Sequence, residues 1–307
     1  MTLEPVPPFN FDLSAFIFTG GDPQVRSYSD GTFRQVIRVR GALLLAEVRA
    51  SGSVDHPEVH ISLEPGPVAG KIVHEAGEII SRIFTLDLDL SPFITAVKDD
   101  PVMSAIARRL RGLKPPRTAT VFEALADSII EQQISLAAAH SIEKRVTRTF
   151  GDILELSGER YYAFPTPGRL ADASPAELRA CGLSLKKAEY IIGIARMVSD
   201  GSLDLETHPP EEDTETIIRE LSTLHGVGVW TAELAALRGL SRLDAIPADD
   251  LGIRRAISQY YSRESRINTA EARRIASSWG DWRGLAAYYL LVAERMAIGI
   301  PDLKIRP

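Results

Sequence analysis

The chain has 307 residues and a mass of 33.6 kDa, a length that suggests two domains with at least one sizeable core. Its 45% hydrophobic and 25% charged residues are typical of a globular protein and exclude a disordered or collagen-like chain. The longest apolar runs fall well short of the ~20 residues that a membrane span needs. A single cysteine, Cys181, excludes a disulfide scaffold and a cysteine-built zinc or iron–sulfur site.

Charge is unevenly distributed along the chain. Residues 1–100 hold 8 Lys/Arg and 14 Asp/Glu, whereas residues 101–307 hold 27 of each. The net charge of −6 therefore lies in the N-terminal third, and a neutral remainder can still present a local basic face. The N-terminal segment has acids and no early base, unlike a secretory signal, so we expect an intracellular, cytoplasmic protein with no membrane association.

The first hundred residues predict a mixed β/α domain. β-type runs at residues 32–39, 42–50 and 59–63, separated by a glycine and a turn-rich segment, favour an antiparallel meander. Residues 68–84 have apolar side chains at helical spacing. They predict one amphipathic helix that covers the sheet.

The segment 111–120 has two adjacent prolines and no periodicity, so it predicts a boundary between residues 1–112 and residues 113–307. The second part shows no strand pattern. Its helical periodicity recurs in segments separated by Gly, Pro or Ser-Asp, at residues 121–150, 175–181, 186–200, 214–224, 231–238, 251–261, 269–279 and 282–296. We therefore predict an α+β protein, with an N-terminal antiparallel β-sheet/helix domain followed by an all-α domain of short helices.

The most informative motif is the glycine pair Gly226 and Gly228. It could open a dinucleotide-binding turn, but Thr231 stands where a third glycine or alanine is needed, and the preceding residues have helical spacing. The motif is therefore a helix, a tight glycine hairpin and a second helix. The free N–H groups of that second helix suit a phosphate, while a plain turn between two helices fits the same residues.

A pair of acids, Asp249 and Asp250 in the tetrad PADD, precedes another helix. Acids at this position cap a helix and complement its dipole, so capping alone explains an isolated pair. The combination is more specific: a glycine hairpin, an amphipathic helix, a short loop and an acid that opens a further helix. In this combination the sequence resembles the helix-hairpin-helix DNA glycosylases.

The resemblance extends along the whole chain to one branch, the 3-methyladenine DNA glycosylase II type. Similar blocks follow in the family's order, among them SIIEQQIS, LHGVGVWTAELAALRG, IPADDLGIRR and SWGDWRGLAAYYL. The resemblance implies a monofunctional DNA glycosylase that excises alkylated bases, 3-methyladenine first, from double-stranded DNA in base excision repair. It implies a nucleoid-associated monomer without a cofactor. The alternatives are a noncatalytic damaged-DNA-binding protein on the same fold and a glycosylase for oxidised purines.

The family pattern assigns the catalytic role to Asp250, the second acid of the pair, which is followed five residues later by Arg255. Asp249 is then the cap or a loop-shaping residue. A fixed carboxylate stabilises the positive charge that develops on the sugar as a base leaves. An alkylated base that is already cationic leaves as a neutral molecule and needs no strong acid.

Trp230 stands where bifunctional relatives carry the lysine that attacks the sugar, and an indole cannot form a Schiff base. The nearest lysines along the sequence, Lys187 and Lys304, are remote from the hairpin, so the resemblance implies no strand cleavage. Two roles remain open for the Trp230 ring. It stacks on a flipped cationic base, or it packs in the core at a helix start.

The remaining site residues also come from the resemblance. Gln133 matches the side chain that wedges into the duplex, although the residues alone favour an ordinary exposed helix position. The implied DNA-binding set is Gln133, Gly226, Val227, Gly228, Val229 and Thr231. The implied base pocket, more aliphatic than the family's, is lined by Trp230, Leu234, Leu251, Tyr288, Tyr289 and Phe18. A structural Na⁺ or K⁺ is implied at the backbone carbonyls of Ser222, Leu224 and Val227.

Overall fold

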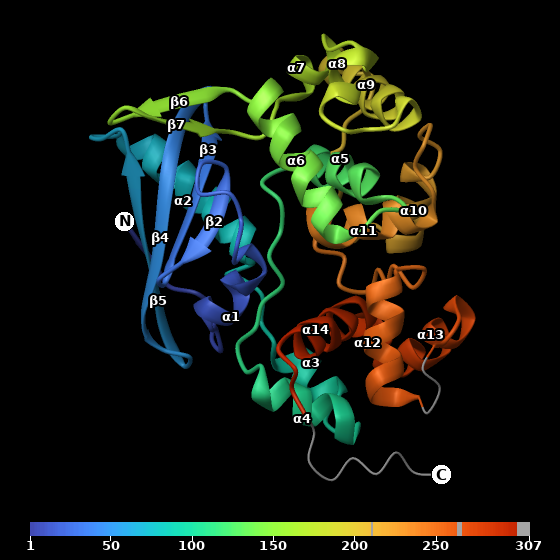
Figure 1. The fold of residues 1–307 in the computed structure, drawn as a ribbon. Helices are drawn as coiled ribbons and strands as arrows, with labels where there is room; N and C mark the ends of the chain where they lie inside the picture. The colour runs from blue at the N-terminus through green and yellow to red at the C-terminus, as the bar shows by residue number, and fades with distance from the viewer. Residues whose placement is uncertain (210, 263–265, 300–307) are drawn as a thin grey trace.

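The structure is a computed structural model and describes residues 1–209, 211–262 and 266–299. Figure 1 shows a β-sheet on one side of the molecule and helices on the other. The prediction of an α+β fold, with an antiparallel sheet domain followed by a mostly helical region, is confirmed. Within the described ranges, no helix combines the length and apolar character needed to cross a membrane.

The N-terminal sheet contains five antiparallel strands in the order β1-β5-β4-β3-β2. The expected meander is present as β3, β4 and β5, whereas the short outer strands β1 and β2 were not predicted. The strands are β1 (Thr2–Leu3), β2 (Arg26–Ser29), β3 (Thr32–Val39), β4 (Ala42–Ser53) and β5 (His56–Glu64). Helix α2 (Gly70–Phe84) is the predicted amphipathic helix, and α1 (Phe11–Ala15) and the 3₁₀ turn η1 (Phe16–Phe18) lie between β1 and β2 in the chain.

Strand register explains how the sheet is buried. Phe33 of β3 pairs with Val48 of β4, and Ile37 pairs with Leu44, so alternate residues of neighbouring strands reach the same face. That face and one side of α2 enclose a core that includes Phe84. The helical spacing of the apolar residues in α2 therefore has the role that the sequence predicted.

The remaining elements form the helical half of the molecule. They are α3 (Ser91–Ala96), α4 (Pro101–Arg109), α5 (Val121–Glu131), α6 (Leu136–Phe150), α7 (Pro167–Ala171), α8 (Pro175–Ala180), α9 (Leu185–Ser199), α10 (Thr214–Leu221), α11 (Val229–Leu240), α12 (Leu251–Tyr261), α13 (Thr269–Ala276), the 3₁₀ segment η2 (Ser277–Trp282) and α14 (Arg283–Arg295). Most of these bounds lie within a few residues of the predicted segments. The predicted helix over residues 121–150 is instead two helices, α5 and α6, because the turn between them holds Gln133 at a φ of 55°.

The expectation of no strand beyond the linker is wrong. Strands β6 (Ile153–Leu156) and β7 (Glu159–Tyr162) form a hairpin, whose turn residues Ser157 and Gly158 both have positive φ. The hairpin packs its apolar side chains on Val36 and Leu45, on the face of the sheet opposite α2. This contact between the sheet domain and the helical half is therefore made by strands, not by helices.

Two cores divide the helical half. One is built by α5 to α11, and the other is built by α3, α4 and the C-terminal helices α12 to α14. Helices α3 and α4 therefore share a core with α12 and α14, although the expected boundary near residue 112 placed them with the sheet. The loop 241–250 connects the two groups, and Figure 1 shows α11 and α12 on either side of it.

Lys114 attaches the linker to the N-terminal domain. Its side chain is completely buried, and its Nζ donates to the carbonyls of Val6 and Leu86, each at 2.8 Å. The ammonium also lies 5.6 Å from the centroid of the Phe9 ring. Burial lowers the pKa of Lys114 to about 8.

We predict that Lys114→Met destabilises the fold by about 1–3 kcal/mol, because the Val6 carbonyl loses its buried donor. Between pH 8 and 10 the unfolded state binds more protons at Lys114 than the folded state, so the free energy of unfolding of the unaltered protein rises with pH. The gap to the variant should therefore widen over that range in denaturant titrations. The exposed Lys98→Met is the control and should change stability by less than about 0.5 kcal/mol at every pH. A gap that stays constant with pH contradicts the assignment.

Candidate active site and DNA-binding hairpin

The two glycines of the hairpin have different structural roles. Gly226 has a φ of +89°, and a Cβ there would lie 2.1 Å from ring atoms of Tyr190, so only glycine fits. Gly228 has an ordinary extended backbone and open space where a Cβ would point. The first glycine therefore lets α9 pack against the hairpin, and the second leaves the approach to the α11 N-terminus uncovered.

The start of α11 presents unpaired backbone donors. Gly228 is its N-cap and offers no side-chain acceptor, so the first N–H groups of the helix are left without a capping partner. Val229 is half exposed, whereas the side chains of Val227 and Thr231 are buried. Of the predicted DNA-binding set, Val227 and Thr231 can therefore contribute through their backbone only.

Asp250 is the N-cap of α12. Its Oδ1 accepts hydrogen bonds from the backbone N–H groups of Gly252 at 2.8 Å and Ile253 at 3.0 Å. Within the part of the chain that the structure describes, Oδ2 accepts none. One oxygen thus fixes the carboxylate while the other remains available.

Of the two roles expected for Asp249, the helix cap and loop shaping, the structure shows the second, because Asp250 is the cap. Its Oδ1 accepts a hydrogen bond of 2.6 Å from the hydroxyl of Thr269, at the start of α13. Asp249 is exposed and ties the loop to α13, which is the loop-shaping role that the sequence left open. Capping and the proposed chemistry therefore fall on the same residue, Asp250.

Arg238 is a charged neighbour of Asp250 that the sequence reasoning missed. Its Nη1 contacts Glu131 Oε1 at 2.7 Å. Burial alone would lower the pKa of Arg238, but the carboxylates of Glu131, Asp127 and Asp250 outweigh burial and raise it. Nothing in the sequence around a single arginine on an amphipathic helix indicates that it lies beside a candidate catalytic residue.

The predicted pocket residues divide into two groups. Leu251, directly after Asp250, is 74% exposed. Trp230 is half-buried, and its Nε1 is a buried donor that finds no hydrogen-bond partner among the described residues, as is the hydroxyl of Tyr288. Trp230, the buried Leu234 and Arg238 recur every four residues and share one face of α11.

Tyr288 belongs to the same neighbourhood. Burial raises the pKa of its hydroxyl, and the charges of Arg295 and Arg238 oppose that shift. Tyr288 comes from α14, in one helical group, and Arg238 comes from α11, in the other. The candidate site therefore lies where the two groups meet.

Two residues predicted for the pocket lie elsewhere. Tyr289 is 2% exposed, its hydroxyl donates to the Leu113 carbonyl at 2.6 Å, and its ring packs on Phe93. It is a core residue, and we do not retain it in the pocket. Phe18 is partly buried against the ring of Phe33, with its centroid 5.4 Å from the Arg26 guanidinium, at the edge of the sheet core.

Gln133 lies on an exposed turn between α5 and α6 and not within a helix. The turn residue after it, Ile134, and the first residue of α6, Leu136, are each 39% exposed. Exposed apolar side chains beside an amide are suited to insertion between stacked bases. The position is consistent with the wedge role implied by the resemblance.

Lys187, expected to be remote from the hairpin, is close to it in space. Its Nζ donates to the carbonyl of Gln132 at 2.6 Å, and the Gln132 amide in turn donates to the Gly226 carbonyl at 2.9 Å. The separation along the sequence was therefore misleading. Lys304 lies outside the described residues.

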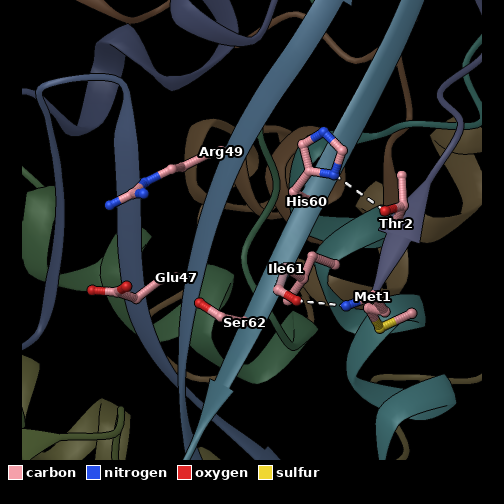
Figure 2. A pocket seen from close by; sticks show the side chains of 7 residues that line it. All are labelled: Met1, Thr2, Glu47, Arg49, His60, Ile61 and Ser62. Carbon is pink, nitrogen blue, oxygen red and sulfur yellow. Dashed lines mark hydrogen bonds between the residues drawn. The ribbon is translucent and has the colours of Figure 1, made fainter.

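A hollow in the described surface lies away from these residues, on the N-terminal sheet. Figure 2 shows it on the N-terminal sheet, lined by Met1, Thr2, Glu47, Arg49, His60, Ile61 and Ser62. Its polar residues alternate with core residues on β4 and β5, so they lie on the face opposite α2. Among the described residues, no group of three or more His, Cys, Asp or Glu side chains could hold a metal ion.

The hairpin carbonyls fit a monovalent ion by their chemistry. Neutral backbone oxygens carry no charge of their own, and the Leu224 carbonyl keeps a second lone pair beside the hydrogen bond of 3.0 Å that it accepts from Val227 N–H. Ser222, Leu224 and Val227 would then hold the ion. The Na⁺ or K⁺ site stays a prediction.

Comparisons with known proteins agree with this arrangement. The family described as HhH-GPD superfamily base excision DNA repair protein matches residues 126–281. A DNA-3-methyladenine glycosylase of Bacillus subtilis is 35% identical over 70% of this chain and 71% of its own length. DNA-3-methyladenine glycosylase 2 of Escherichia coli is 30% identical over 95% of this chain and 97% of its own.

A solved structure, the 3-methyladenine DNA glycosylase of Archaeoglobus fulgidus, has the same fold. It superposes with a TM-score of 0.81 and covers 98% of this chain and 100% of its own, at 23% identity. The chain belongs to the HhH-GPD superfamily of base excision DNA repair proteins. The resemblance found in the sequence is confirmed.

We predict that Gly228→Asp separates stability from DNA binding. Asp is a good N-cap and the site has room for it, so thermal unfolding should stay unchanged or improve slightly. The added negative charge should weaken binding by about tenfold or more, equally for damaged and undamaged duplexes. Fluorescence anisotropy measures both affinities. Gly228→Ser, which caps without charge, is the control, and normal binding by the Asp variant would remove the hairpin from the DNA interface.

Proposed function

We propose that Asp250 carries the excision of alkylated bases from duplex DNA by this chain, with 3-methyladenine as the first substrate. The chain is an alkylbase DNA glycosylase of base excision repair, by its similarity to the 3-methyladenine glycosylases. The observation that supports the role of Asp250 is its geometry. Two backbone N–H groups orient the carboxylate at a helix start, and Oδ2 is left available.

The proposed mechanism assigns separate tasks to separate groups. The α11 N-terminus binds a phosphate, and Gln133 fills the space that the flipped nucleotide leaves in the stack. Asp250 Oδ2 faces the sugar and stabilises the positive charge that develops as the base departs. Because Arg238 is paired with Glu131, its charge is largely balanced and does not neutralise Asp250.

The proposed base pocket consists of Trp230, Leu234, Leu251 and Tyr288, without Phe18, which packs at the edge of the sheet core. The half-buried Trp230 ring offers a face for stacking on an electron-poor cationic base. Its Nε1 and the Tyr288 hydroxyl are buried donors that a bound base can satisfy. A panel of single-lesion duplexes separates this specificity from oxidised purines, and release of free base from methylated DNA excludes a noncatalytic binder.

We predict that Asp250→Asn lowers single-turnover excision by about 10² or more. Asn is as good an N-cap as Asp, so the fold and the binding of abasic-analogue DNA should persist. Asp249→Asn is the matched control, because it removes the same charge from the neighbouring residue, whose carboxylate contacts Thr269 of α13. If the Asp249 variant loses more activity than the Asp250 variant, the assignment within the pair is wrong.

We also predict that excision leaves an intact abasic strand. Trp230 supplies no amine at the lyase position, and the Lys187 ammonium is held by two carbonyl oxygens. Borohydride added during turnover should therefore trap no protein–DNA adduct, as judged by a denaturing gel. A robust adduct that disappears in Lys187→Met would identify Lys187 as an unexpected nucleophile and overturn the monofunctional assignment.

A further inference from the structure

The turn of residues 132–135, here called the wedge turn, is exposed but is held at its base. It contains Gln133 in the left-handed region and ends at Ser135, whose hydroxyl caps α6. A four-residue exposed turn of this kind would by itself be compliant. The contacts that hold it come from two other parts of the helical group.

The first contact is with α9. Lys187 Nζ donates to the carbonyls of Ile130 at 2.8 Å and Gln132 at 2.6 Å, which are end carbonyls of α5 that the helix itself leaves free. Burial lowers the pKa of this ammonium. The ammonium is thus partly desolvated, and its two hydrogen bonds fix the chain on the N-terminal side of Gln133.

The second contact is with the hairpin. The Gln132 amide nitrogen donates to the Gly226 carbonyl at 2.9 Å and to the Thr231 hydroxyl at 3.0 Å. Gly226 is the positive-φ glycine of the hairpin, and Thr231 lies in the first turn of α11. A single side chain therefore joins the wedge turn to the phosphate-binding element.

The third contact joins α9 directly to the hairpin. Tyr190 lies one turn after Lys187 on α9, so both side chains leave the same face of that helix. The Tyr190 ring covers Gly226 and meets the His225 ring edge-on, with centroids 4.8 Å apart. Helix α9 therefore contacts the wedge turn through Lys187 and the hairpin through Tyr190.

We propose that Lys187 and Gln132 are positioning residues that couple the wedge turn to the phosphate-binding hairpin. This proposal rests on the proposed function, in which Gln133 enters the duplex. Binding of a phosphate at the hairpin fixes Gly226, and the Gln132 and Lys187 contacts then hold Gln133 at a set distance from that phosphate. The free energy of phosphate binding is thereby used to unstack a base and not to deform an exposed turn.

The test uses single-turnover excision by the full chain from two duplexes that differ in one partner. In the first, 7-methylguanine is paired with cytosine, and in the second it lies opposite an abasic-site analogue, where less stacking and pairing must be broken. Lys187→Met should lower the paired rate by about tenfold and the unpaired rate by less than about twofold. Lys187→Arg, which restores donors, should recover most of the loss.

Two further variants exclude trivial explanations. Lys186→Met removes the same charge from the exposed neighbouring residue and should change both rates by one common factor. Gln132→Met removes the other contact and should reproduce the selective loss on the paired duplex. Thermal unfolding of each variant is measured alongside. If Lys187→Met lowers both rates equally, Lys187 only stabilises the fold, and the proposal is overturned.

A readout without excision separates this proposal from the proposed function. 2-Aminopurine opposite an abasic-site analogue changes fluorescence when a side chain enters the stack. The unaltered protein and Lys187→Arg should give that change, and Lys187→Met should give less at saturating protein. If the unaltered protein releases no alkylated base, the proposed function fails. If it does release base and Lys187→Met matches it in both assays, only the coupling fails.

Discussion

The cap that Asp250 forms on α12 is the contact on which the site depends. A carboxylate needed for charge stabilisation must not rotate toward water, and two backbone N–H groups prevent that rotation. The cap can place the carboxylate only if α12 itself is held in position. A contact outside the loop 241–250 supports this arrangement. Arg273 of α13 pairs with the buried Glu233 of α11 at 2.7 Å, and burial raises the pKa of Glu233 to about 7. Helix α11, before the loop, is thereby joined to α13, which follows α12, by a contact outside the loop.

Helix α5 connects this site to the N-terminal domain. Glu123, Asp127 and Glu131 recur every four residues along one face. Arg26 of β2 pairs with Glu123 at 2.9 Å at one end, and Arg238 pairs with Glu131 at the other. Burial, with the charges of Glu143 and Glu123, holds the pKa of Asp127 between them well above its usual range. The sheet domain therefore reaches the candidate site through a row of buried and half-buried ionisable side chains.

The sequence predicted what local pattern determines. The meander, the amphipathic α2 and the bounds of α12 follow from periodicity and caps, and the hairpin and PADD motifs located the site. It could not predict the break at Gln133, because a positive φ in a non-glycine residue leaves no compositional trace. Nor could it place Lys187, because contact with the wedge turn is a property of tertiary packing. Tyr288 and Tyr289 make the same point, since neighbours on a helix point about 100° apart and only one can face the site.

Selectivity for alkylated bases follows from what the retained pocket residues can do. Trp230 Nε1 donates a hydrogen bond but does not release its proton, and burial raises the pKa of the Tyr288 hydroxyl, which makes it a weaker acid than in water. Neither group can protonate a neutral base as it leaves. In the proposed mechanism Asp250 acts on the sugar, so it helps every base to the same extent. A base that already carries a positive charge needs no proton to depart, and the proposed site therefore favours alkylated bases by their rate of departure as well as by their fit.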